Sequence, residues 1–386
     1  MDTFIHSRAA AEQYLELTNG ITPALIFNPK TITNAWKQLQ SVLPGVTLYY
    51  AVKSNPYESI LKELNTEGAR FDVASAPEIE ALLTLGVSVD RVIHTHPIKT
   101  TNDLQLSYDL GVRTFVVDNA DELWKLVPFR RDVKIMLRLA FVAPDAPIDL
   151  SRKFGAQPVD AMELLSVAKH MGLEVDGLCF HVGSQAASAT THALALSRCF
   201  SITKEAKQKS IADITRIDMG GGFPANYVNR PIDFNKFCAP INEVIKSCPA
   251  GIQLMAEPGR SISAPSMSLV SRVIGRSKRQ DNVMWYYLDD GVYGAQSGRI
   301  YDHIDYPMHI FTDMTETAPA VFAGPTCDSI DYLGTQSEVP LLSIGDIVVI
   351  KEIGAYSVAT ACSFNGIRPP MIIDLDENQE LTRMLA

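Results

Sequence analysis

The chain has 386 residues, of which 46% are hydrophobic and 20% charged, a composition that excludes disordered, collagen-like and low-complexity proteins. Its net charge is −10, without long charged runs, so we expect neither a nucleic-acid nor a membrane partner. The start, MDTFIHSRAAAEQYLEL, has no signal-peptide pattern, and no apolar stretch is long enough to span a bilayer. We therefore expect a cytoplasmic protein.

Six cysteines occur without a CxxC pair or a histidine at metal-ligand spacing, so we expect no metal site. Most are interpreted as small buried side chains in a reducing compartment. Cys327 is different, because it lies in the loop GPTCDSID (324–331), bounded by glycine and proline. Exposure there would permit thiol chemistry, and an inert buried thiol is the alternative.

Short apolar or β-branched runs alternate with stretches of helical periodicity between residues 47 and 259. Their starts lie 20 to 23 residues apart at first and 37 to 44 apart later, which leaves room for longer connections. Eight such units most simply close into a (β/α)8 TIM-type barrel, with an open doubly wound sheet as the alternative. The eight runs are TLYYA (47–51), RFDVA (70–74), RVIHT (91–95), RTFVVD (113–118), VKIMLRLA (133–140), GLCFHVG (177–183), ITRIDMG (214–220) and IQLMAEPG (252–259).

Helices are predicted between these runs, for example over 75–86, with Ser75 as its cap and Gly86 at its end, and over 160–172. After about residue 262 the pattern becomes strand-like, with turn residues between short runs, which predicts a C-terminal β-sandwich or barrel-like domain. The strand TPALIFN (22–28) could join that domain. We thus divide the chain into a barrel, 28–262, and a β domain formed by 1–27 plus 263–386.

The catalytic mouth of a TIM-type barrel lies at the C-terminal ends of its strands. Lys53 directly follows an apolar strand, where a buried amine could form a Schiff base with an aldehyde; a solvated surface lysine is the alternative. Asp72 has two ordinary alternatives, a helix cap or a partner for Arg70. The residues at the predicted strand ends are Lys53, Asp72, His94, Asp118, Arg138, His181, Gly220, Gly221, Gly222 and Glu257.

Two later loops suggest a phosphate site. In MGGGF (219–223) three glycines could let backbone N–H groups surround a phosphate, or could simply form a tight turn. In AEPGRS (256–261), Arg260 could bind a phosphate and Glu257 could meet a pyridine nitrogen, or the two could form a structural ion pair. His181 could stack on a flat cofactor or be an ordinary core histidine.

Taken in order, these and other runs resemble the fold-type III pyridoxal-phosphate amino-acid decarboxylases, most closely the ornithine decarboxylase branch. The similarity covers most of the chain. Each run alone is weakly specific, whereas the ordered set is highly specific. The runs are YYAVKSNP (49–56), RFDVAS (70–75), FHVGSQ (180–185), DMGGGFP (218–224), AEPGRS (256–261), DDGVYG (289–294), IYDH (300–303), GPTCDSID (324–331), GAYS (354–357) and SFNG (363–366).

The resemblance implies a barrel followed by a β domain, the architecture also found in alanine racemase, and a homodimer whose active sites lie at the subunit interface. It implies that Lys53 holds pyridoxal 5′-phosphate through an imine, that His181 stacks on the ring and that Glu257 pairs with the ring nitrogen. The other residues that it implies for cofactor binding are Asp72, Arg138, Ser184, Gly220, Gly221, Gly222, Gly259, Arg260 and Tyr356.

For the substrate, the resemblance implies that Asp302, together with Asp328 of the partner subunit, receives the distal ammonium group. Cys327, also from the partner, would return a proton to the substrate carbon after carbon dioxide leaves. Tyr293 and Phe364 would line the substrate pocket. A dibasic amino acid fits these carboxylates, because they neutralise its amine on burial.

The predicted reaction is therefore decarboxylation of L-ornithine to putrescine, a step of polyamine biosynthesis, with L-lysine to cadaverine ranked second. Diaminopimelate ranks third: Arg299 near Asp302 could receive its extra carboxylate, but CDSID departs from the CESxD loop of that branch. A racemase is disfavoured because Glu257 strengthens the electron sink. A catalytically silent regulatory homologue is disfavoured because Lys53, Glu257 and Arg260 are all retained.

Overall fold

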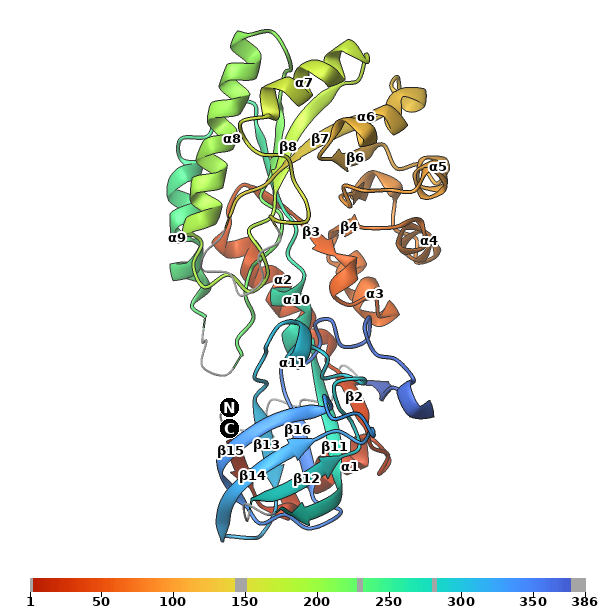
Figure 1. Cartoon of the computed structure of the whole chain (residues 1–386), viewed down its shortest axis with the longest axis vertical. Coiled ribbons are helices and arrows are strands. Elements are labelled where there is room, and N and C mark those ends of the chain that lie inside the picture. Colours follow the sequence, from red (N-terminus) through yellow and green to blue (C-terminus); the bar gives the residue numbers. More distant parts are fainter. Residues whose placement is uncertain (1–2, 143–150, 228–231, 280–282, 376–386) are drawn as a thin grey trace.

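The structure is a computed structural model that describes residues 3–142, 151–227, 232–279 and 283–375. A barrel with surrounding helices lies above a smaller β-sheet domain in Figure 1. Eight parallel strands close the barrel in the order β10-β3-β4-β5-β6-β7-β8-β9, which confirms the predicted TIM-type architecture. The barrel strands are β3 (Val46–Ala51), β4 (Arg70–Val73), β5 (Val92–His94), β6 (Thr114–Val117), β7 (Lys134–Leu139), β8 (Val175–Phe180), β9 (Arg216–Asp218) and β10 (Gln253–Ala256).

Helices cover the outside of the barrel. The N-terminus of one of them, α4 (Ala76–Thr84), shows which side chains bind the first backbone N–H groups of a helix. Ser75 occupies the predicted N-cap position, but its side chain makes no capping hydrogen bond. Instead, the Glu78 carboxylate accepts from the Ala74 N–H (2.7 Å) and the Asp103 carboxylate accepts from the Ala76 N–H (2.8 Å). The barrel helices are α2 (Pro29–Val42), α3 (Glu58–Thr66), α4 (Ala76–Thr84), α5 (Thr101–Asp109), α6 (Ala120–Leu126), α7 (Ala161–His170), α8 (Thr190–Gln208) and α9 (Phe234–Ile245).

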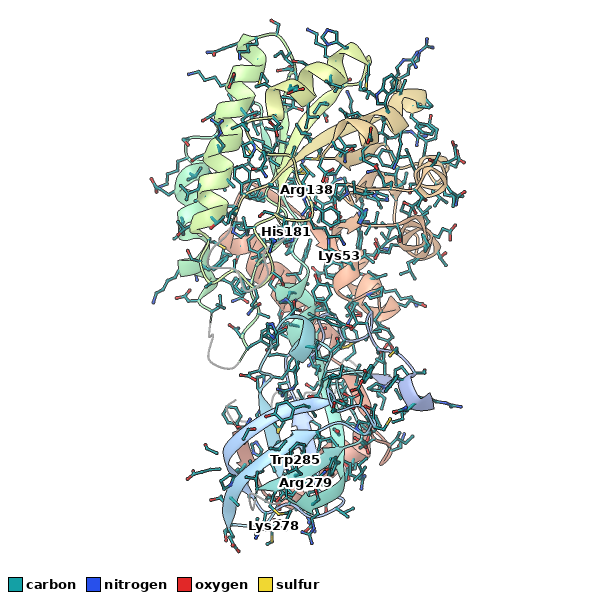
Figure 2. All side chains as sticks on the ribbon, in the orientation of Figure 1. Lys53, Arg138, His181, Lys278, Arg279 and Trp285 are labelled. Carbon is teal, nitrogen blue, oxygen red and sulfur yellow. The ribbon has the colours of Figure 1, made fainter. Side chains whose placement is uncertain are left out.

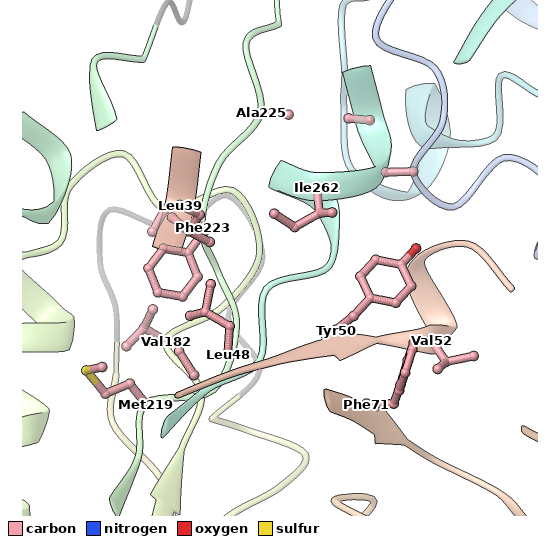
Figure 3. Packing of buried hydrophobic residues seen from close by; sticks show 14 of the residues in the cluster. Leu39, Leu48, Tyr50, Val52, Phe71, Val182, Met219, Phe223, Ala225 and Ile262 are labelled. Atoms are coloured by element: carbon pink, nitrogen blue, oxygen red, sulfur yellow. The ribbon is translucent and has the colours of Figure 1, made fainter. Parts of the chain in front are cut away.

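Successive side chains along the barrel strands belong to two different hydrophobic clusters, one inside the barrel and one between the barrel and its helices. Tyr49 joins a small cluster formed entirely by strand residues, whereas its neighbours Leu48 and Tyr50 join the large cluster that includes the helices. Successive side chains of a strand point to opposite faces, so Tyr49 fills the barrel interior while Tyr50 packs outward. Figure 3 shows Tyr50 beside Phe71, its neighbour in the register between β3 and β4. Cys179 belongs to this interior cluster. Cys179, Cys199 and Cys238 are buried as expected, whereas Cys248 is half-buried and Cys362 is exposed, contrary to the expectation of burial for most of the cysteines.

The second domain is a nine-stranded sheet with the path β1-β13-β16-β11-β12-β14-β15. The lone strand expected near residues 22–28 is β2, which pairs antiparallel with β11 and parallel with β17. The N-terminal strand β1, which the sequence did not predict, pairs parallel with β13. The strands are β1 (Thr3–His6), β2 (Ala24–Phe27), β11 (Met267–Lys278), β12 (Met284–Leu288), β13 (Met308–Phe311), β14 (Thr317–Ala323), β15 (Tyr332–Pro340), β16 (Ile347–Ile350) and β17 (Met371–Asp374).

Contacts between the barrel and the sheet domain lie next to the end of β3. The Asn55 amide donates to the carbonyl of Gly354 (2.7 Å), and the Tyr356 N–H donates to the carbonyl of Ser54 (2.7 Å). The loop that carries Tyr356 is thereby held at the barrel mouth. The division at residues 28 and 262 stays a prediction, and its outermost residues, 1–2 and 376–386, lie outside the described ranges. Within those ranges, the helices are too short or too polar to cross a bilayer.

Candidate active site

A cavity of about 210 Å³ lies at the C-terminal ends of the barrel strands. Figure 2 places Lys53, Arg138 and His181 close together in the barrel part of the molecule. Most of the cofactor-binding residues expected from the sequence line this cavity. The expected residues among its lining are Lys53, Arg138, His181, Ser184, Gly221, Gly222, Glu257, Gly259, Arg260 and Tyr356.

Lys53 follows β3 and presents its amine to the cavity. Its side chain is 41% accessible, but that surface faces the cavity, so Lys53 is not an ordinary surface lysine. Its Nζ lies 3.3 Å from Oδ2 of Asp72, which is 1% exposed and also accepts a hydrogen bond from the Thr95 hydroxyl. Burial lowers the pKa of Lys53, but the Asp72 and Glu257 carboxylates outweigh it and raise that pKa overall. Asp72 therefore neither caps a helix nor pairs with Arg70.

Glu257 follows β10 and shares a buried site with Asp218, the last residue of β9. Oδ1 of Asp218 accepts a hydrogen bond from the Gly220 N–H (2.8 Å), whereas its buried Oδ2 has no partner in the described part of the chain. Burial raises the pKa of Glu257 well above its ordinary value, and the Asp218 and Asp72 carboxylates raise it further. The pKa of Asp218 is raised to about 6, first by burial and then by Asp72. Two neighbouring buried carboxyl groups cannot readily both ionise, so each favours the protonated form of the other.

This pair makes folding stability depend on pH. Asp218 binds its proton more tightly in the folded state (pKa about 6) than in the unfolded state (3.8), so its contribution is lost as pH rises through this range. Asp218→Asn is isosteric and cannot ionise. We expect the free energy of unfolding of the variant, relative to that of wild type, to increase by on the order of 2 kcal/mol from pH 4 to pH 7. Urea titration of the apoprotein at each pH measures this difference.

The matched control is Asp213→Asn, since Asp213 is an exposed carboxylate just before β9. Its stability difference from wild type should stay constant over the same pH range. A constant difference for Asp218→Asn as well would show that folding does not raise the pKa of Asp218.

The glycine loop after β9 packs closely against neighbouring backbone, which leaves no room for side chains at two of its glycines. A Cβ on Gly220 would lie 2.2 Å from the Phe180 carbonyl, and one on Gly222 would lie 2.6 Å from the Gly183 carbonyl. Both residues also have positive φ angles, 63° and 96°, which disfavour any side chain. In the described part of the chain, the N–H groups of Gly221 and Gly222 have no protein acceptor, and both residues line the cavity. Such unengaged N–H groups fit an anion such as a phosphate.

Arg260 is the buried cation beside this loop. Its Nε and Nη2 donate to the Ser184 hydroxyl (3.2 and 3.0 Å), and its Nη1 lies 3.2 Å from the Tyr227 hydroxyl. Nη2 also forms an ion pair with Asp302 at 2.5 Å, so Arg260 pairs with Asp302 rather than with Glu257. The guanidinium carbon lies 4.7 Å from the centre of the Tyr356 ring. A fixed guanidinium with adjacent hydroxyls is suited to binding a phosphate.

His181 lines the cavity from the loop after β8. Its Nδ1 accepts a hydrogen bond from the Gly183 N–H (3.1 Å). Burial lowers the pKa of His181 well below its ordinary value, and the nearby Arg138 and Lys53 cations lower it further. The ring is therefore a neutral, flat surface in the cavity rather than a cation.

Four other predicted residues form a second group, which we call the loop group: Tyr293, Cys327, Asp328 and Phe364. The Tyr293 hydroxyl donates to Asp328 (2.5 Å), and the Tyr293 and Phe364 rings stack with centres 4.3 Å apart. The Cys327 N–H donates to the Asn365 side chain (3.1 Å). Cys327 is exposed, in agreement with the loop argument, and none of the loop group lines the cavity of the same chain.

Some residues named from the sequence have other surroundings. His94 is fully buried against Asp103 (3.1 Å), and Asp118 accepts from the Gly155 N–H (2.8 Å), so these two strand ends stabilise the framework. Arg299 is buried beside Gln296 and Asp305 and does not line the cavity. Sequence reasoning missed several site residues; of these, only Asp218 had a signal, as an acid at a strand end. The missed residues are Thr95, His96, Pro97, Phe154, Gln185, Asp218, Phe223 and Tyr227.

Comparison with known proteins agrees with this site. Residues 29–264 match the family model of the pyridoxal-dependent decarboxylases, pyridoxal binding domain. A lysine/ornithine decarboxylase of Selenomonas ruminantium is 36% identical over 367 residues, covering 94% of this chain and 92% of that protein. The lysine/ornithine decarboxylase of Vibrio vulnificus, solved with cadaverine and with putrescine, has a TM-score of 0.89 and 37% identity, covering 96% of this chain and 98% of that one.

A third structure, that of SrLDC with pyridoxal phosphate and cadaverine, has a TM-score of 0.89 and 33% identity over 98% of this chain and 96% of that one. The family match covers more than half of the chain, and the relatives cover nearly all of it. The observed barrel-plus-sheet fold is also that of these structures. The chain belongs to the fold-type III pyridoxal-phosphate-dependent decarboxylases.

Proposed function

We propose that this protein decarboxylates L-ornithine to putrescine and carbon dioxide, accepts L-lysine as a second substrate to give cadaverine, and serves polyamine biosynthesis. The observation that carries the proposal is that Lys53 and Glu257 open into one cavity at the barrel mouth, with the carboxylate Asp302 beside it on Arg260. Relatives named lysine/ornithine decarboxylase, solved with cadaverine and putrescine, support the substrate class.

The residues of the cavity fit pyridoxal phosphate. The unengaged N–H groups of Gly221 and Gly222, with Arg260 and its hydroxyl partner, would hold the phosphate. Lys53 would bind the aldehyde carbon, and Glu257 would hold a proton at the ring nitrogen. The neutral His181 ring would cover one face of the cofactor. When bound, the cofactor supplies an electron sink for the pair left on the substrate carbon as carbon dioxide departs.

Substrate recognition would depend on carboxylates. When the cofactor binds, the ion pair of Asp302 with Arg260 would break, and Arg260 would bind the phosphate. The Asp302 carboxylate would then pair with the distal ammonium group of the substrate, which offsets the cost of burying that amine. Arg299 is unsuited to receive a second substrate carboxylate, because it is buried beside Asp305 outside the cavity. The position of Arg299 disfavours diaminopimelate, and the acidic surroundings favour a substrate with a free terminal amine.

We also propose that two copies of the chain share each active site. Cys327 and Asp328 do not line the cavity of their own chain, yet Cys327 is the proposed acid that returns a proton to the substrate carbon. Exposed apolar side chains surround that loop, including Ile330, Tyr332 and Phe364. An apolar group of this kind is suited to burial against a partner, and a second copy would bring the loop group to the Lys53 cavity.

The test is a panel of L-ornithine, L-lysine, L-arginine and diaminopimelate, with carbon dioxide and amine product measured for each. We expect kcat/KM for ornithine and lysine to lie within about a hundredfold of each other, and diaminopimelate to be at least about a hundredfold poorer than ornithine. Cofactor binding without carbon dioxide from any of the four would indicate a catalytically silent homologue. D-ornithine appearing from L-ornithine would indicate a racemase instead.

A further inference from the structure

The glycine loop at residues 220–222 is held through its three carbonyl groups. The Gly220 carbonyl accepts from the Glu257 N–H (2.8 Å), and the Gly222 carbonyl accepts from the Ala186 N–H (3.0 Å). The Gly221 carbonyl is different, because it accepts from a side chain, Nε2 of His192, at 3.0 Å. His192 comes from α8 and does not line the cavity.

The carbonyl partners determine where the N–H groups of the loop point. A peptide unit is planar, and its C=O and N–H point in opposite directions. The hydrogen bond to the Gly221 carbonyl therefore fixes the direction of the Gly222 N–H, which belongs to the same peptide unit. In the same way, the hydrogen bond to the Gly220 carbonyl fixes the direction of the Gly221 N–H. The Gly222 N–H faces no protein acceptor in the described ranges, and Gly222 lines the cavity. His192 thus fixes the direction of an N–H group that is available to an anion.

The imidazole of His192 is itself firmly held. The residue is fully buried, and its ring centre lies 5.2 Å from that of Phe223 and 6.1 Å from that of Phe237. Figure 3 shows Phe223 within the packed core beside Val182. Because the partner is a carbonyl, the hydrogen must reside on Nε2. A histidine used only for packing would not need its donor aimed at the glycine loop.

We propose that His192 is a positioning residue of the phosphate site, which directs the Gly222 N–H at the phosphate of pyridoxal phosphate. This role rests on the phosphate location proposed above. His192 acts through the loop and touches neither the cofactor nor the substrate. Its removal should weaken binding of the phosphate and leave the rest of the cofactor site intact.

The test compares apoprotein binding of pyridoxal phosphate with that of pyridoxal, which lacks the phosphate, by absorbance or fluorescence titration. His192→Phe keeps an aromatic ring and removes the donor, whereas His192→Gln keeps a donor. We expect His192→Phe to raise the Kd for pyridoxal phosphate about tenfold and that for pyridoxal less than about twofold, with His192→Gln recovering most of the loss. The phosphorus-31 resonance of the bound cofactor should shift in His192→Phe. His170→Phe, an exposed histidine on α7, is the control and should behave as wild type.

An unchanged Kd for pyridoxal phosphate in His192→Phe, or an equal loss for both ligands, would overturn the proposal. If His192→Phe does not fold, His192→Met, which also lacks a donor, replaces it in the comparison with His192→Gln. Equal binding of the two ligands by wild type would instead contradict the phosphate location itself. None of these measurements uses decarboxylation, so inactivity toward ornithine and lysine would refute the proposed substrates without affecting the role of His192.

Discussion

Replacing Lys53 with alanine should abolish decarboxylation of ornithine and lysine, lowering kcat by at least about a thousandfold. The reason is the position of its amine, which lies beside Asp72 in the cavity that Glu257 also lines. An amine there would hold the cofactor through its aldehyde, and alanine offers no such group. Initial rates of carbon dioxide release and the visible absorption of the bound cofactor check the prediction.

Two further variants separate covalent chemistry from charge. Lys53→Arg keeps a cation for Asp72 but removes the primary amine, so it should be nearly as inactive as Lys53→Ala. Lys37→Ala removes an exposed lysine from α2, which pairs with Glu67 at 2.8 Å, and should keep wild-type activity. If Lys53→Arg retained most of the activity, Lys53 would act through its charge alone, and the proposed covalent role would be wrong.

Mixing two inactive or impaired variants should restore activity if active sites are shared between chains. Lys53→Ala and Cys327→Ala alter different groups, since Lys53 lines the cavity and Cys327 lies in the exposed loop group. In a mixed dimer, one site would carry both substitutions and the other neither. Random pairing of equal amounts makes half of the dimers mixed, so the mixture should recover about a quarter of wild-type activity.

The chains are best mixed by co-expression or by dilution from mild denaturant, with each variant treated alone as the control. Cys327→Ala alone should slow the reaction and divert some turnovers into side products, because the substrate carbon lacks its proton donor. A mixture no more active than the mean of its two parents would exclude a site built from Lys53 of one chain and Cys327 of the other. Size-exclusion measurements should show a dimer in every sample.

The barrel strands were predictable because each is a short apolar run, buried on both faces and bounded by turn residues. TLYYA and RFDVA match β3 and β4 almost residue for residue. The strand β1 was not recognised, because four residues carry little periodicity and its pairing with β13 joins positions about 300 residues apart. Long-range pairing of this kind leaves no local pattern in the sequence.

Most residues predicted for the active site from their positions at the strand ends line the cavity, but some residues at strand ends do not. His94 and Asp118 lie at such ends and are used by the framework instead. Arg299 is three residues from Asp302 along the chain, yet the single turn α11 (Gly298–Tyr301) leaves Arg299 against the Tyr306 ring while Asp302 reaches Arg260. Neighbours in sequence can thus serve different sites.

The barrel, the β domain and the residues at the strand ends follow from the amino-acid sequence, because alternation, turn residues and ordered motifs are local properties of the chain. Which of these groups meet depends on the packed fold. It brings together the buried carboxyl groups of Asp218 and Glu257, pairs Arg260 with Asp302, keeps the loop group away from the cavity, and places His192 against Gly221. Each of these depends on burial and on distances between segments far apart in the chain, which only the packed fold defines.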